Sequence, residues 1–255
     1  MVNFATKHMK NKMTPTPTFQ FEICANGVES CLAAQQGGAH RVELCASIPE
    51  GGTTPSYGEI RQARRLLDET KLHVIIRPRG GDFVYTELEA ERMLDDIRMC
   101  RQLGVDGVVF GCLTKEGDVD IPLCQRLMEV SQGMSVTFHR AFDRTRNPQQ
   151  ALEDIIALGC NRILTSGQEP KAEAGIGMLR QLNSQARGRI ILLAGSGVDE
   201  SNIARIHRET GICEFHFSAR EPVPCEAREA DKFDFGQRMT TTPERVRNTI
   251  KQLIP

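Results

Sequence analysis

Two short motifs that combine a carboxylate with a thiol lie near the start of the chain, at Glu22-x-Cys24 and Glu43-x-Cys45. Thiolates are soft ligands, so two cysteines that face one cavity could bind a soft metal ion. Two carboxylates that face one cavity raise one another's pKa, which lets one stay protonated near neutrality and lets the pair act as general acid and base. The structural alternative is that the cysteines only pack in the core and that each glutamate pairs with an arginine.

Two histidines can join this chemistry. His216 shares the polar face of the run EFHFS with Glu214 and Ser218, because side chains two residues apart on a strand point the same way. His139 follows the run SVTF, but His139 and Arg140 face opposite sides if that strand stays regular. Either histidine can carry a proton or bind a metal ion near neutral pH.

Two arginines follow another apolar run, in the string IIRPRGGD. Arg77 and Arg79 can hold a carboxylate or phosphate through paired hydrogen bonds, or they can form salt bridges with Asp82 or Asp143. We favour ligand binding for Arg77, because Pro78 stiffens the strand end and the two following glycines permit a tight loop.

Eight apolar runs of strand length carry these residues, and stretches with helical spacing separate them. The runs begin about 28 residues apart, the length of one strand and one helix. Eight such units in 255 residues predict a closed (β/α)8 TIM barrel with its site at the carboxyl ends of the strands. An open, doubly wound sheet fits less well, because no G-x-G-x-x-G string follows the first run. The runs span residues 19–24, 40–45, 71–77, 106–110, 134–139, 161–165, 189–194 and 213–218.

In a barrel, the string AGSGV and the residues after the last run form a further candidate anion contact. Many TIM barrels bind phosphate with the loops after strands seven and eight, where small residues let backbone N–H groups approach the oxygen atoms. A tight turn that needs glycine explains the same string without a ligand. The candidate residues for an anion or substrate are Arg77, Arg79, Arg140, Asp143, Ser166, Gly195, Ser196, Gly197 and Ser218.

The composition excludes several classes of protein. Lys and Arg total 32 against 33 Asp and Glu, so the net charge of −1 gives no global attraction for nucleic acid or an anionic membrane. No apolar run approaches the roughly 20 residues that span a bilayer. The nine cysteines include no C-x-x-C pair, so the sequence has no zinc-ribbon or thioredoxin-like motif. Residues 1–18 lack the apolar region of a secretory signal, so we expect a cytoplasmic protein with reduced thiols. We expect a flexible N-terminal tail at residues 1–18 and one barrel domain at 19–255.

Several strings resemble those of the CutC copper-homeostasis family, among them GGAHRVELC, IIRPRGGDFVY, VTFHRAFD, LTSGQ and AGSGV. The resemblance extends from about Phe19 to Arg220 and is weak over 221–242. It implies a TIM barrel, a cytoplasmic location and a homodimer. It also implies a copper(I) role for two cysteines, which correspond here to Cys24 and Cys45.

Two main functions remain open at this point. One is a copper homeostasis protein that binds Cu(I) through Cys24 and Cys45. The other is a TIM-barrel enzyme that acts on a small anionic or phosphorylated substrate, with Arg77 as its anchor; a ligand sensor without catalysis is a third reading. The acid–base candidates for the enzyme are Glu22, Glu43, His139 and His216.

Overall fold

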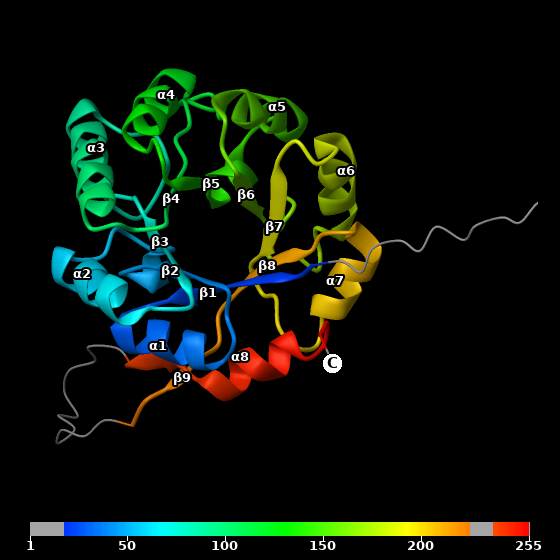
Figure 1. Ribbon diagram of the computed structural model, residues 1–255. Coiled ribbons are helices and arrows are strands. Elements are labelled where there is room, and N and C mark those ends of the chain that lie inside the picture. Colours follow the sequence, from blue (N-terminus) through cyan, green and yellow to red (C-terminus); the bar gives the residue numbers. More distant parts are fainter. Residues whose placement is uncertain (1–17, 225–236, 255) are drawn as a thin grey trace, which may run out of the picture.

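The computed structural model describes residues 18–224 and 237–254. The predicted tail therefore lies outside the described residues except for its last residue. Eight parallel strands close into a barrel, in which each strand pairs with the next and β8 pairs with β1, as Figure 1 shows. The strands are β1 (Gln20–Ala25), β2 (Arg41–Leu44), β3 (Lys71–Ile75), β4 (Gly107–Phe110), β5 (Ser135–Phe138), β6 (Arg162–Thr165), β7 (Ile191–Gly195) and β8 (Glu214–Phe217). The predicted TIM barrel is confirmed.

Helices surround the barrel and alternate with its strands (Figure 1). Among the described residues, every helix is too short or too polar to cross a membrane. The helices are α1 (Val28–Gln36), α2 (Tyr57–Leu66), α3 (Glu87–Gln102), α4 (Ile121–Val130), α5 (Pro148–Leu158), α6 (Ile176–Ala186), α7 (Ile203–Thr210) and α8 (Pro243–Ile250), with short 3-10 helices η1 (Ile48–Glu50) and η2 (Arg140–Arg144) in two of the loops.

Local signals fix where the helices begin and end. The Thr86 side chain accepts a hydrogen bond from the backbone N–H of Glu89, and the Glu89 side chain accepts one from Thr86 N–H, which forms a capping box for α3. Pro148 opens α5, where its missing N–H costs nothing. Gly159 ends α5 with a φ of 84°, a left-handed conformation that glycine adopts without strain.

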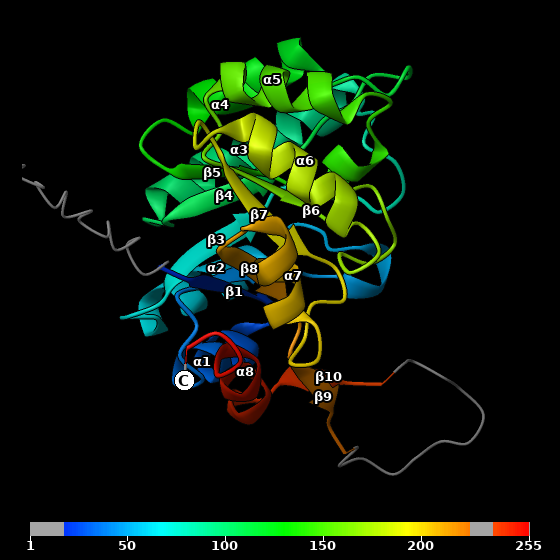
Figure 2. The same ribbon diagram turned by 90° about the vertical axis from the view of Figure 1, so that its right-hand side faces the viewer.

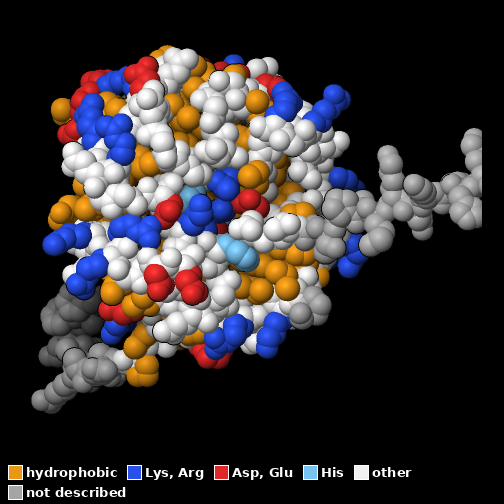
Figure 3. All heavy atoms as spheres, viewed as in Figure 1, with side chains coloured by type: hydrophobic (Ala, Val, Ile, Leu, Met, Phe, Trp, Pro, Cys, Tyr) orange, Lys and Arg blue, Asp and Glu red, His pale blue; other side chains and the backbone are white. Residues whose placement is uncertain are grey.

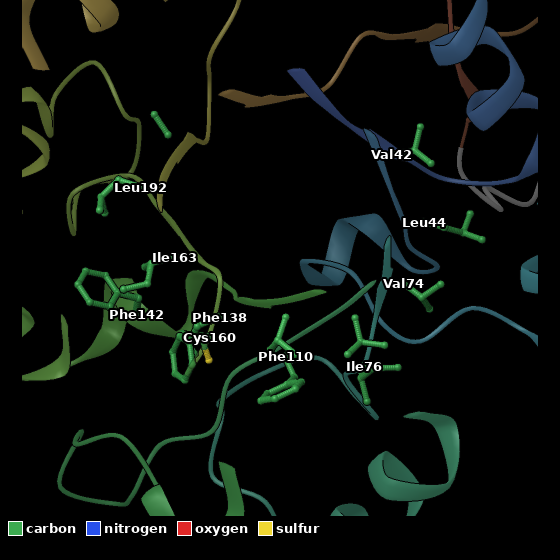
Figure 4. Packing of buried hydrophobic residues seen from close by; sticks show 14 of the residues in the cluster. Val42, Leu44, Val74, Ile76, Phe110, Phe138, Phe142, Cys160, Ile163 and Leu192 are labelled. Atoms are coloured by element: carbon green, nitrogen blue, oxygen red, sulfur yellow. The ribbon is translucent and has the colours of Figure 1, made fainter. Parts of the chain in front are cut away.

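The hydrophobic core lies between the strands and the ring of helices. Every second strand residue faces this layer, as Val42 and Leu44 do on β2, and both are fully buried. Figure 4 shows ten labelled members of the core around the barrel, from Val42 to Leu192. The remaining strand residues face the barrel interior, which leaves the polar Glu-x-Cys face of β1 and β2 for the site.

The segment after β8, where the family resemblance is weak, contains a short antiparallel pair, β9 (Arg220–Pro222) and β10 (Met239–Thr241). Residues 225–236 between them lie outside the described part of the chain. Helix α8 then packs against α1, as both views show (Figures 1 and 2). Val246 of α8 is fully buried and sits where Gly37 has no side chain, since a Cβ there would lie 2.5 Å from the valine.

Candidate functional site

A cavity of about 290 Å³ lies at the carboxyl ends of the strands. Its wall combines apolar side chains with most of the residues expected from the sequence. The predicted site residues that line it are Cys24, Glu43, Cys45, Arg77, His139, Arg140, Ser196, Gly197, His216 and Ser218. The structure thus brings together both cysteines, both histidines and residues from six of the eight strand ends.

The other predicted residues do not line the cavity, and in each case the local surroundings explain why. Glu22 is fully buried beneath it. Arg79 turns away to bind the Glu89 carboxylate at 2.6 Å, with a second salt bridge to Asp82. Gly195 lies behind His216, where a Cβ would come within 3.2 Å of the His216 Cβ.

Asp143 and Ser166 form part of a scaffold that holds Arg140. The Asp143 carboxylate accepts hydrogen bonds from Arg140 Nε at 2.7 Å and from the Ser166 hydroxyl at 2.9 Å. Arg140 also donates to the Ser166 hydroxyl at 3.0 Å. Both His139 and Arg140 reach the cavity, because β5 ends at Phe138 and η2 begins at Arg140, so strand alternation no longer applies to them.

The buried carboxylate of Glu22 is the centre of a charged network beneath the cavity. Arg41 Nε donates to one of its oxygens, and His216 Nδ1 lies 2.7 Å from the other. Arg41 also binds Glu214 at 2.9 Å. Burial raises the pKa of Glu22, but the charge of Arg41 and the hydrogen bond with His216 outweigh it and hold this pKa well below its usual range. Glu22 is therefore the ionised anchor that orients His216.

Two sulfur atoms and a carboxylate form a compact cluster in the cavity wall. The ligand atoms of Cys24, Glu43 and Cys45 all lie within 4.8 Å of one another. Cys24 pairs in register with Glu43, so Cys45 lies two residues further along the chain, just after the end of β2, and its side chain still reaches the cluster. The Cys45 thiol donates to Glu43 Oε2 at 3.4 Å, and His216 Nε2 lies 3.8 Å from the same oxygen.

The protonation states in this cluster differ from one residue to the next. A hydrogen bond from Cys45 lowers the pKa of Cys24 well below its usual value against the effect of burial, and His216 lowers it further. The hydrogen bond to Cys24 and burial raise the pKa of Cys45. Burial raises the pKa of Glu43 to about 8. Burial lowers the pKa of His216, but hydrogen bonds with Cys24 and Glu22 raise it well above its usual value. These shifts favour the thiolate form of Cys24 and the imidazolium form of His216.

The loops after β7 and β8 form the rim of the cavity. The Ser196 hydroxyl donates to Pro170 O at 2.7 Å, and the Ser218 hydroxyl accepts from Arg220 Nε at 2.8 Å. A Cβ at Gly197 would lie 3.1 Å from the side chain of Lys171. The proton of the Ser196 hydroxyl is thus used by a backbone carbonyl, whereas the Ser218 hydroxyl only accepts a hydrogen bond, and an anion at this rim stays a prediction.

Several residues of the site are not evident from their sequence patterns. His73 on β3 is buried and lies 3.9 Å from Glu22, although its run resembles an ordinary strand entry. Arg220, the first residue of β9, and Phe83, in the loop between β3 and α3, also line the cavity. For Arg220 a signal exists, since it continues the polar face of Glu214 and His216.

Acid is expected to destabilise the protein through the buried side chain of His73. Burial lowers the pKa of His73 from 6.5 to about 3, so it is neutral in the folded chain. Between these two values the unfolded state binds more protons than the folded state. The contribution of the neutral His73 to the free energy of unfolding is therefore complete above pH 6.5 and is lost as the pH falls toward 3. Urea denaturation at pH 7 and pH 5 measures this. The variant His73→Gln should lose roughly 2 kcal/mol less than the wild type between the two pH values. An equal loss in both proteins would contradict a neutral His73.

The barrel and the cavity at its carboxyl ends place the chain among the TIM-barrel proteins, whose sites lie at this end. The CutC family model matches residues 19–221, and the chain belongs to the CutC family. It is 63% identical over 244 residues to a CutC family protein of Bacteroides thetaiotaomicron. The aligned region covers 92% of this chain and 98% of the relative. It is 59% identical over 244 residues to one of Bacteroides fragilis, with 92% and 97% covered.

Solved structures agree with this assignment. A proposed copper homeostasis protein CutC from Streptococcus agalactiae matches with a TM-score of 0.75 and 35% identity, covering 78% of this chain and 98% of that one. Phosphoribosylanthranilate isomerase from Thermotoga maritima matches with a TM-score of 0.56 at 14% identity, covering 92% and 98% of the two chains. The second likeness concerns the fold alone.

Proposed function

We propose that this protein binds Cu(I) through the thiol groups of Cys24 and Cys45. The observation that carries the proposal is the close approach of both side chains, with that of Glu43, within 4.8 Å in the wall of one cavity. Thiolate sulfur is the ligand type that Cu(I) prefers. The name of the Streptococcus agalactiae relative, a proposed copper homeostasis protein, is consistent with it. Copper is here the cargo of the protein.

The donor set and its surroundings fit this ion. Cys24 is partly exposed in the cavity, so an ion can reach its sulfur, and the adjacent His216 favours the thiolate form. Glu43 accepts the hydrogen bond of the Cys45 thiol and so orients that side chain. Glu22 in turn holds His216. Outer contacts of this kind orient ligands and typically change metal affinity by about 10–100-fold when they are removed.

The test is a titration of the reduced, metal-free protein with Cu(I) against a chelator of known affinity. We expect one Cu(I) per chain, and no binding in the double variant Cys24→Ser/Cys45→Ser. Cys213→Ser is the matched control, because this thiol lies just before β8, at the opposite end of the strand from the cavity. Wild-type affinity in the double variant would refute the proposal.

A further inference from the structure

Arg77 is a buried cation that has no carboxylate partner at salt-bridge distance among the described residues. It is only 4% exposed. Its terminal nitrogens donate to three backbone carbonyls, Glu50 O and Gly52 O at 2.8 Å and Gly81 O at 3.0 Å, which fix the guanidinium between two loops. Its Nε is buried without a hydrogen-bond partner. Buried charges in proteins are normally paired, so this one indicates an anion that comes from outside the chain.

His139 presents a second buried donor without a partner. The backbone N–H of Ala141 donates to His139 Nδ1 at 3.2 Å, which places the ring proton of the neutral histidine on Nε2. Nε2 is buried and unpartnered. Burial, together with the charge of Arg77, lowers the pKa of His139 to about 3, so the ring stays neutral and remains an N–H donor at ordinary pH.

Both donor side chains pack against the same aromatic ring, that of Phe83. The guanidinium of Arg77 lies 5.1 Å from the centre of the Phe83 ring, and the His139 ring lies 5.0 Å from the same centre. All three residues line the cavity, together with the apolar side chains of Ile48 and Ile75. Both nitrogens are buried, and neither has a hydrogen-bond partner among the described residues.

We propose that Arg77 Nε–H and His139 Nε2–H bind the carboxylate group of a small organic acid. One uncompensated positive charge matches one carboxylate, and the two donors can each serve one of its oxygens. A phosphate dianion fits less well beside Arg77, because Arg140 of the same wall is paired with Asp143 and Arg220 is held by the Ser218 hydroxyl at the rim. The cavity of about 290 Å³ limits the ligand to a small molecule with an apolar body against Phe83 and the two isoleucines. The carboxylate would use other residues of the same cavity wall than the thiol pair of the proposed copper site.

The experiment follows the side-chain N–H signals of Arg77 and His139 by nuclear magnetic resonance while sodium acetate is added to the reduced, copper-free protein. Sodium chloride and inorganic phosphate at matched ionic strength are the comparison titrations. We expect saturable shifts of both signals with acetate and none with chloride. Shifts that are absent, or equal with chloride, would overturn the proposal, and tighter binding of phosphate would overturn the carboxylate assignment.

Substitutions at the two donor residues test whether they bind the acetate. We expect His139→Gln and Arg77→Lys each to weaken acetate binding at least about tenfold, the loss typical of one charge-assisted hydrogen bond. His139→Gln keeps the test valid if Arg77→Lys does not fold. Arg79→Gln is the matched control, since Arg79 lies on the same loop outside the cavity and should leave acetate binding unchanged. Acetate binding should persist in Cys24→Ser/Cys45→Ser, and its loss there would overturn the separation of the two sites.

Discussion

Changing Cys24 alone to serine is expected to lower the affinity for Cu(I) by more than about 100-fold, because the substitution replaces a soft thiolate ligand by a hard hydroxyl. Removing an outer contact typically costs 10–100-fold, and the loss of a ligand should exceed that. Cys45→Ser should have a comparable effect, since Cu(I) held by two thiolates loses half of its ligands in either variant. The measurement is competition with a Cu(I) chelator in the absence of oxygen.

His216→Gln supplies the graded comparison. His216 contacts Cys24 and is held by Glu22. As an orienting residue it should contribute about 10–100-fold to the Cu(I) affinity, clearly less than either cysteine. A His216 variant that binds as poorly as Cys24→Ser would make the histidine a ligand. A Cys24→Ser protein with unchanged affinity would place the copper elsewhere.

The fold could be predicted from local patterns, because each strand of the barrel corresponds to one short apolar run in the sequence. The apolar runs predicted β1 at residues 19–24 and β8 at 213–218, and the structure has Gln20–Ala25 and Glu214–Phe217. Strand side chains alternate with a period of two, so an apolar face toward the helices implies a second face inside the barrel. That logic also placed Glu22 and Cys24 on one interior face.

The partners of these residues could not be predicted, because they depend on the register of the closed barrel. Glu22 contacts Arg41 on one neighbouring strand and His216 on the other, 19 and 194 positions away in the sequence. Nothing in the run KLHVI distinguishes a buried His73 from an exposed one. In the same way, Arg79 and Asp143 were expected to contact a ligand, but Arg79 pairs with Glu89 of α3 and Asp143 with Arg140 of η2.

The burial of Glu22 has a large expected effect on stability. Replacing it with glutamine should lower the free energy of unfolding by about 3–5 kcal/mol, because the substitution removes one partner of a buried ion pair and leaves Arg41 and His216 short of negative charge. The side chain of Glu22 has no exposed surface, so water cannot compensate the lost charge. Urea denaturation at pH 7 measures the effect. Glu91→Gln is the control, since its pair with Arg126 is exposed and should contribute less than about 1 kcal/mol.

A double-mutant cycle shows whether the ion pair itself is responsible. If the loss in Glu22→Gln comes mainly from an uncompensated Arg41, then adding Arg41→Gln should restore part of it, and the two single losses should exceed the loss in the double variant by about 0.5–3 kcal/mol. Glu214 limits this recovery, because it also pairs with Arg41 and becomes short of positive charge in the double variant, although Arg162 still binds it at 2.8 Å. Strict additivity of the two changes would mean that Glu22 acts on stability through His216 rather than through Arg41.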